Sequence, residues 1–307
     1  MNMTKRTANM MLFVIAAFWG SGFIVTRIAL DANVSAGFVN FARGLIFAIL
    51  AFLFFHKKLF KMTVKDFKVG LIAGLLNFGG VLAQTVGVQY TTPSNNAFIT
   101  STYVVIVPFI AWFIYKKPLK IKSFISIAFC TFGMAILSGV LSRGATINIG
   151  DAYSLLSAII YAGSIAYNSY GARKTDATIV AFMLAIVQAI GGLGAFLFFD
   201  GGQLSSVEWQ AAILPLLYMG IICSFVAQTV QVFAQKYTSA TTAGLIMMLE
   251  GPFGSLFSVA FGFESLTLSM IIGGSIIMGA LVLMETNFGQ FRFMLSRKFE
   301  VGQNRNI

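Results

Sequence analysis

Residues 10–30 read MMLFVIAAFWGSGFIVTRIAL, and Arg27 is the one charged side chain in this stretch. A helix of about 20 residues is about 30 Å long, which matches the apolar core of a lipid bilayer. Backbone polar groups inside a bilayer must be paired within their own segment, so a continuous apolar stretch of this length predicts a transmembrane helix.

The rest of the chain repeats this pattern. Apolar residues make up 58% of the 307 positions, and charged residues only 10%, against about 25% in globular proteins. Nine further apolar spans lie at 36–55, 67–89, 94–115, 120–141, 149–171, 176–199, 210–235, 239–261 and 266–285. Ten crossings use about 200 residues and leave no room for a separate soluble domain. We therefore predict an all-α polytopic membrane protein with ten transmembrane helices.

The basic residues predict the orientation of these helices. Eighteen of the 21 Lys and Arg residues lie in the two ends of the chain and in alternate loops: 57–68, 116–122, 173–174 and 236. Of the other three, Arg143 lies in a loop on the opposite side, while Arg27 and Arg43 lie within spans. Cytoplasmic loops carry the excess of cations, so both ends are expected in the cytoplasm. Membrane topology thus explains the net charge of +11, and no nucleic-acid partner is needed.

The two halves of the chain share an order of features. A shift of 147 residues aligns Gln84 with Gln231 and Tyr90-Thr91 with Tyr237-Thr238. Five spans in each half reverse the orientation of the second half, an arrangement typical of secondary transporters that bind substrate between inverted repeats. The expected units are repeats at 1–143 and 144–286, followed by a basic cytoplasmic tail at 287–307.

Several motifs resemble one known family. They are AFWGSGF at 17–23, NFARG at 40–44, GDAYSLLSA at 150–158 and LEGPF at 249–253. Together they are similar to the EamA-type transporters of the drug/metabolite transporter superfamily. The resemblance implies two inverted five-helix repeats around a central cavity, and it implies transport of amino acids, other metabolites or drugs.

Glu250 is the sharpest functional candidate. It lies about 16 Å deep in its span, where a carboxylate is costly unless it faces water or a cation or is protonated. It is expected to bind a substrate ammonium or carry a coupling proton. A structural alternative is that it accepts hydrogen bonds from backbone groups near Pro252. Pro252 and Pro108 should kink the ninth and fourth helices, either as gating hinges or as static bends.

Polar side chains recur at helical spacing on several spans. Such stripes point to a partner helix or to an aqueous cavity rather than to lipid. Four stripes favour a cavity, and Trp19, Tyr103 and Tyr161 add rings that could stack on substrate. The candidate substrate-binding residues are Trp19, Ser21, Asn77, Gln84, Thr100, Tyr103, Tyr161, Ser164, Asn168, Gln228, Gln231 and Glu250.

Two further features concern positioning. Arg43 lies about seven residues inside the second span, and we favour a structural or gating role for it over attraction of an anionic substrate. The glycines Gly70, Gly74, Gly191, Gly192 and Gly194 suggest close helix packing.

Signatures of other classes are missing from the sequence. His56 is the only histidine, so His-based metal sites and Ser-His relays lack their parts. No phosphate-binding Gly-x-x-x-x-Gly-Lys motif is present, which argues against direct use of ATP. No cofactor and no metal are therefore expected.

The sequence favours a secondary transporter in the cytoplasmic membrane that exports amino acids or similar small metabolites by alternating access, facilitated or proton-coupled. The expected partners are a small-molecule substrate and the lipid bilayer, and a homodimer stays open. The nearest alternatives are an uptake permease or a multidrug efflux protein of the same fold. From other classes, a membrane-embedded lipid-modifying enzyme and a non-transporting scaffold or receptor remain.

Overall fold

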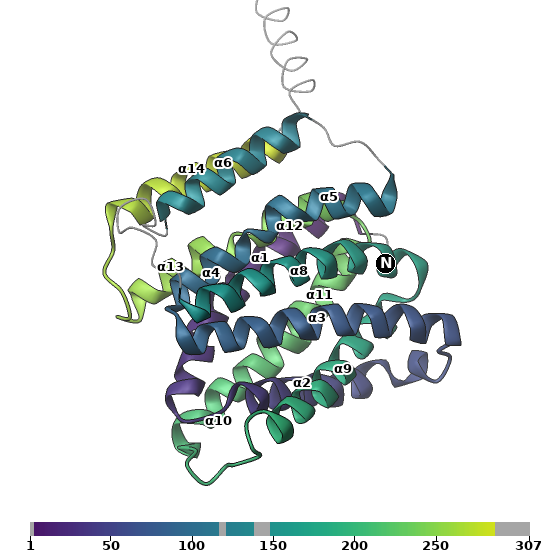
Figure 1. Ribbon diagram of the computed structural model, residues 1–307. Coiled ribbons are helices and arrows are strands. Elements are labelled where there is room, and N and C mark those ends of the chain that lie inside the picture. The colour runs from purple at the N-terminus through teal and green to yellow at the C-terminus, as the bar shows by residue number, and fades with distance from the viewer. Residues whose placement is uncertain (1–2, 117–120, 138–147, 286–307) are drawn as a thin grey trace, which may run out of the picture.

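The computed structural model describes residues 3–116, 121–137 and 148–285, and every regular element in these ranges is a helix (Figure 1). The first half contains α1 (Lys5–Asp31), α2 (Ala36–Leu59), α3 (Val64–Tyr90), α4 (Pro93–Ser101), α5 (Tyr103–Tyr115) and α6 (Ile121–Leu137). The second half contains α8 (Ile149–Lys174), α9 (Ala177–Phe198), α10 (Trp209–Tyr218), the π-helix η1 (Met219–Val226), α11 (Ala227–Gln235), α12 (Ala240–Met247), α13 (Glu250–Ala260) and α14 (Leu268–Glu285). Lys117, Lys120, Arg143 and the expected tail at 287–307 lie outside the described residues.

These helices coincide with the predicted apolar spans. In the described residues, eight helices, some of them interrupted, are long and apolar enough to cross a membrane. The two remaining apolar helices, Ile121–Ile136 and Leu268–Leu283, are shorter. The all-helical architecture is confirmed, whereas the count of ten crossings stays a prediction.

Two spans are interrupted near their middles. The fourth span breaks at Thr102, between α4 and α5, and the ninth breaks at Met248–Leu249, between α12 and α13. Pro252 is the third residue of α13, in the first helical turn, where a missing N–H costs no intrahelical bond. Pro108 lies inside α5, six residues after Thr102. The ninth span thus breaks beside its proline and the fourth does not.

The eighth span contains an irregularity that the sequence analysis did not predict. Pro215 lies inside α10, and the chain then continues as the π-helix η1. A π-helical turn adds residues to the turn and changes which side chains face a neighbour, and such turns are frequent at functional sites. Here the turn carries Cys223 and Ser224.

Small residues let the two halves approach closely where α2 packs against α9. A Cβ atom at Gly192 of α9 would lie 2.3 Å from the backbone nitrogen of Phe41, and one at Gly44 of α2 would lie 2.5 Å from that of Ala189. Gly70, Gly74 and Gly191 similarly meet side chains of the opposite half, as expected. Gly194 has no neighbour within 4 Å of a built Cβ, so close packing was the wrong expectation there.

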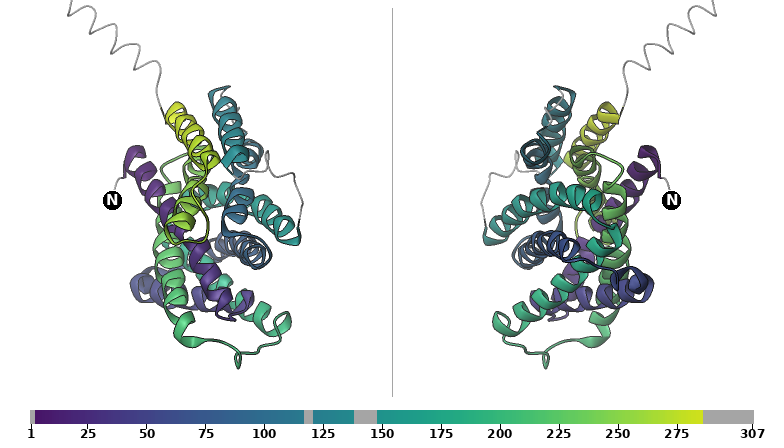
Figure 2. Two further views of the ribbon diagram at one scale, coloured as in Figure 1. Left: turned by 90° about the vertical axis from the view of Figure 1, so that its left-hand side faces the viewer. Right: turned by 90° about the vertical axis from the view of Figure 1, so that its right-hand side faces the viewer.

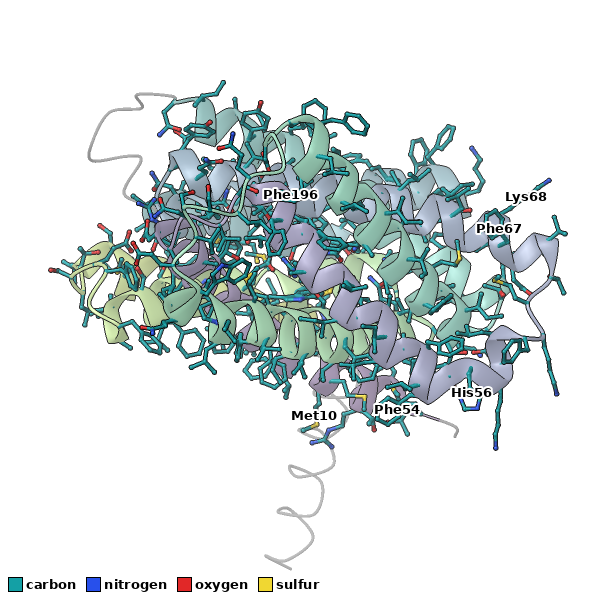
Figure 3. The ribbon with its side chains drawn as sticks, turned by 90° about the horizontal axis from the view of Figure 1, so that it is seen from below. Met10, Phe54, His56, Phe67, Lys68 and Phe196 are labelled. Carbon is teal, nitrogen blue, oxygen red and sulfur yellow. The ribbon has the colours of Figure 1, made fainter. Side chains whose placement is uncertain are left out.

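Helices α6 and α14 lie beside each other at one side of the bundle, as both views of Figure 2 show. The remaining helices surround the centre of the molecule, with α3 packed on α8 and α9, and α1 packed on α13. Large apolar side chains point away from this bundle, among them Met10, Phe54 and Phe67 (Figure 3). An outer surface of this kind suits contact with lipid rather than water.

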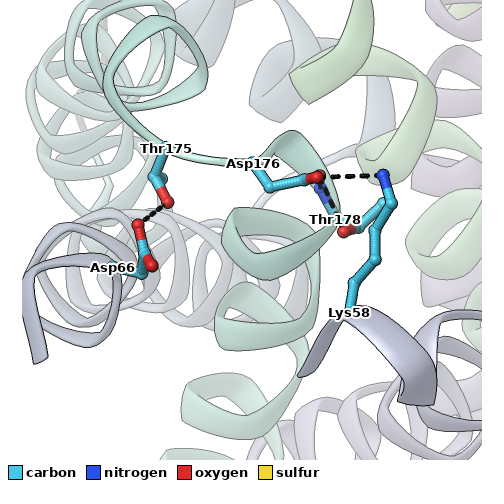
Figure 4. Close-up of polar contacts among 5 residues, drawn as sticks. All are labelled: Lys58, Asp66, Thr175, Asp176 and Thr178. Carbon is cyan, nitrogen blue, oxygen red and sulfur yellow. Dashed lines mark hydrogen bonds and ion pairs between the residues drawn. The ribbon is translucent and has the colours of Figure 1, made fainter. Parts of the chain in front are cut away.

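The loops that carry the basic residues meet at one end of the bundle. The ammonium group of Lys58, at the end of α2, lies 2.9 Å from Asp176 Oδ2 in the loop between α8 and α9 (Figure 4). Thr175 of the same loop donates a hydrogen bond to Asp66 of α3. These contacts join the first half of the chain to the second. We refer to Lys58, Asp66, Thr175 and Asp176 as the loop clamp.

Candidate functional site

A cavity lies between the two halves of the chain. Its empty volume is about 700 Å³, including the space open to solvent at its mouth. The lining comes from α1, α2, α3 and α5 of the first half and from α8, η1, α11, α12 and α13 of the second. Helices of both halves thus enclose one open space at the centre of the bundle.

The interrupted spans contribute Tyr103 and Glu250 to this cavity. Tyr103 is the first residue of α5 and Glu250 the first residue of α13, and the two side chains are near enough to interact electrostatically. Glu250 is only 5% exposed.

Arg43 brings a positive charge to the same cavity. Its side chain is only 7% exposed, and Nε donates a 2.8 Å hydrogen bond to Ser224 Oγ of η1. Tyr161 of α8 is near enough to both Arg43 and Glu250 to interact electrostatically with each of them. The rings of Tyr161 and Tyr103 meet edge to face with centroids 6.5 Å apart. One acidic and one basic side chain thus line the same cavity, together with two tyrosines.

Amides form a second polar group in the cavity wall. Asn77 of α3 donates a 3.0 Å hydrogen bond to the side-chain oxygen of Gln228 in α11, and Gln228 donates a 3.4 Å bond to Gln188 of α9. The Tyr161 hydroxyl donates a 3.3 Å bond to the side-chain oxygen of Gln84. These bonds connect helices of both halves and fix the side chains that face the cavity.

Trp19 joins α1 to the π-helix. The indole Nε1 donates a 2.9 Å hydrogen bond to the backbone carbonyl of Cys223. This bond holds a large ring at the cavity wall.

The structure brings together nine of the residues named from sequence. The residues that line the cavity are Trp19, Arg43, Asn77, Gln84, Tyr103, Tyr161, Gln228, Gln231 and Glu250. Pro108 and Pro252 lie outside the lining, although Pro252 is two residues from Glu250.

The other four named residues lie away from the cavity, packed between helices. Ser21 bonds to the Phe18 carbonyl and to the Tyr218 hydroxyl, at 2.8 and 2.7 Å. Ser164 accepts a 3.4 Å bond from Asn168, and Thr100 is fully buried in α4. Their helical spacing correctly indicated an inward face, but part of that face meets a neighbouring helix instead of the open space.

Ten lining residues were missed by the sequence analysis. They are Gly22, Phe23, Thr26, Val81, Thr85, Val88, Ile165, Met219, Cys223 and Met247. Most are apolar and share the composition of every span, so no sequence signal separates them from lipid-facing positions. Thr85, one residue after Gln84, is the one polar residue of α3 among these ten.

The chemistry of this lining is that of binding. In the described part of the chain, no three His, Cys, Asp or Glu side chains gather closely enough to hold a metal ion. Arg43 and Glu250 offer opposite charges, the amides offer hydrogen bonds, and Phe23, Val81 and Met247 offer apolar contact. Such a wall can hold a small solute that has both polar and apolar parts.

Comparison with known proteins gives a consistent result. The model of the EamA-like transporter family matches residues 6–139 and again residues 148–286. An uncharacterized transporter of Archaeoglobus fulgidus is 36% identical over 279 residues, which cover 91% of this chain and 85% of that protein. Solute carrier family 35 member F2 of Mus musculus is 26% identical over 183 residues, or 57% of this chain and 48% of that protein. A solved crystal structure shares the fold, with a TM-score of 0.72, 16% identity, and coverage of 96% of this chain and 99% of that one.

Proposed function

Because the chain belongs to the EamA-like transporter family, and is therefore a multi-pass membrane transporter, we propose that it exports amino acids or similar small metabolites by alternating access. The observation that carries the proposal is the cavity between the halves, which has one buried carboxylate and one buried guanidinium in a largely apolar wall. An amino acid carries the two complementary charges on a small, partly apolar body.

The proposal includes ten crossings arranged as two inverted repeats. Two features support it: the family model matches twice, and the fourth and ninth spans are both interrupted. In transporters, interrupted helices at corresponding places in the two repeats typically form the substrate site. Helices α6 and α14 would supply the fifth crossing of each repeat.

Orientation follows from the loop clamp under this proposal. The clamp lies among the loops that contain most of the lysines, so it would close the cytoplasmic end of the bundle in the cytoplasmic membrane. Opening to the cytoplasm would then require these contacts to break. Both ends of the chain would lie on the same side.

Energy for transport would come from a solute gradient or from protons carried by Glu250. In the part of the chain that the structure describes, this carboxyl group is the one acidic side chain that lines the cavity, and its protonation would change the charge of the site by one unit. A carboxylate buried in a membrane span is a common element of proton pathways.

The direct test is counterflow in liposomes that contain the purified protein. Liposomes loaded with one unlabelled amino acid at a time should take up the same labelled amino acid faster than protein-free liposomes do. A panel of amino acids, nucleobases and cationic drugs separates metabolite export from multidrug efflux. Flux measured with gradients imposed in each direction separates export from uptake. Absence of counterflow for every compound would favour a scaffold or an enzyme.

A further inference from the structure

Arg43 presents donors that the protein itself leaves unused. Its Nε bonds to Ser224, and among the described residues the terminal nitrogens of the guanidinium group have no hydrogen-bond partner. The side chain is more than nine-tenths buried and lines the cavity. A guanidinium group has five N–H donors in a planar fork, so four donors remain for a ligand.

Among the described residues, no carboxylate forms an ion pair with Arg43. In the described part of the chain, ion pairs join Arg27 to Asp31 and Lys58 to Asp176, and neither involves Arg43. Glu250 lines the same cavity but forms no ion pair with Arg43. A guanidinium group stays ionised in proteins, and a buried charge without a partner is strongly unfavourable. The site is therefore electrostatically incomplete when the cavity holds no anion.

The charge needed to balance Arg43 indicates the chemical class of the ligand. Arg43 is the one cationic side chain among the described residues that line the cavity, so a single negative charge balances it. A carboxylate carries one charge and pairs with the guanidinium fork through two parallel hydrogen bonds. A phosphate monoester carries about −1.5 to −2 at neutral pH and would leave charge uncompensated in a largely apolar wall.

We propose that Arg43 is the subsite for a carboxylate of the transported solute, and that Ser224 is a positioning residue that holds the guanidinium fork towards the cavity. This inference rests on the proposed function, and it replaces the structural or gating role expected for Arg43 from sequence. It also orients the solute, with its anionic end at α2 and η1 and its remaining part towards Tyr161, Tyr103 and Glu250.

The decisive comparison uses the wild-type protein and matched ligands. L-Leucine, L-methionine and L-phenylalanine are compared with their amides, which keep the ammonium group and side chain but lack the carboxylate charge. Binding is measured in detergent by the change in unfolding temperature and by Trp fluorescence. At least one acid should bind, and its amide should bind about tenfold more weakly or worse, as expected for the loss of a charge-assisted pair. Equal binding of acid and amide, or no binding by any acid, overturns the proposal.

Variants then assign the effect to the two residues. The Arg43→Gln variant should bind the acid and the amide equally, while Arg43→Lys should keep part of the preference for the acid. Ser224→Ala should weaken binding of the acid several-fold and leave binding of the amide unchanged. Ser224→Thr, which keeps the hydroxyl, should restore binding of the acid. Equal weakening of both ligands by Arg43→Gln, in a variant that still elutes as a single species on gel filtration, contradicts the assignment.

Two controls distinguish this inference from binding of another anion and from the proposed transport itself. Inorganic phosphate and vesicles containing phosphatidic acid test the other sources of an anion, and stronger competition by either one overturns the assignment to a carboxylate. Counterflow separates the site from transport. If the wild-type protein shows counterflow but does not discriminate between acid and amide, only the carboxylate subsite is overturned. If it discriminates in a way that depends on Arg43 but shows no counterflow, only the proposed transport is overturned.

Discussion

The side chains of Tyr103 and Glu250 are near enough to interact electrostatically, and each of these residues begins the second segment of an interrupted span. They are 147 residues apart, and the same shift aligns Gln84 with Gln231. All four side chains line one cavity. Two pairs of residues that are each 147 positions apart therefore line the same cavity, and one pair lies where two spans are interrupted.

The first prediction concerns Glu250 as a carrier of protons. Glu250→Gln keeps the shape of the side chain but cannot release a proton. In liposomes with an imposed pH gradient, we expect the wild-type protein to concentrate substrate and the variant to perform only exchange. Tyr103→Phe, which removes the hydroxyl but keeps the carboxyl group, should retain coupling with altered pH dependence. Concentration of substrate by Glu250→Gln would show that the proton role is wrong.

The second prediction concerns the contact between α2 and α9. Gly192→Ala places a Cβ atom 2.3 Å from the backbone of Phe41, so the helices must separate. We expect a loss of about 1–3 kcal/mol in the free energy of unfolding, as for other overpacked sites, measured by denaturation in mixed micelles. Gly194→Ala on the same helix is the matched control, because nothing lies within 4 Å of its Cβ. Equal effects of the two changes would contradict this packing.

The third prediction concerns the loop clamp and pH. Partial burial alone would raise the pKa of Asp176, but hydrogen bonds from Lys58 and from the backbone and hydroxyl of Thr178 outweigh it and hold that pKa below its usual value. The stabilisation is therefore present at neutral pH and is lost as the pH falls through the lowered pKa.

Asp176→Asn tests this dependence, because asparagine can still cap α9 while the charge is lost. Since Asp176 and Lys58 are partly exposed, we expect a difference of about 1 kcal/mol or less at neutral pH. The difference should shrink towards zero in acid, as measured by thermal unfolding from pH 7 to the lowest pH that the protein tolerates. Lys58→Met should show the same trend, whereas Lys57→Met serves as the matched control. A difference that does not change with pH would contradict the ion pair.

The sequence predicted the helices well, but it predicted less well where they are interrupted and what each side chain contacts. Long apolar spans predicted the helices because a membrane span must pair its own backbone groups. The break at Thr102 could not be predicted, because Pro108 indicates an irregular helix in the fourth span but not the residue at which that helix is interrupted. The π-helix at Met219–Val226 also gave no recognisable sequence signal.

Side-chain roles show the same limit. Helical spacing identified inward faces, and it correctly grouped Gln228 with Gln231. It could not separate Asn77, which lines the cavity, from Asn168, which packs between helices, because spacing gives a direction but not what lies opposite. A structural or gating role was favoured for Arg43 from sequence over attraction of an anionic substrate, because the surroundings of its donors are not visible in the sequence.

The central claim is that the cavity opens to each side of the membrane in turn, and the native thiol of Cys223 in its wall reports this directly. In a Cys130→Ser background, a membrane-impermeant methanethiosulfonate reagent is applied to vesicles of each orientation, with the denatured protein as the labelling control. We expect Cys223 to be modified from both sides. A short crosslink between Lys58→Cys and Asp176→Cys should abolish modification from the cytoplasmic side alone. Modification from a single side, or from neither, in the protein without the crosslink would contradict alternating access.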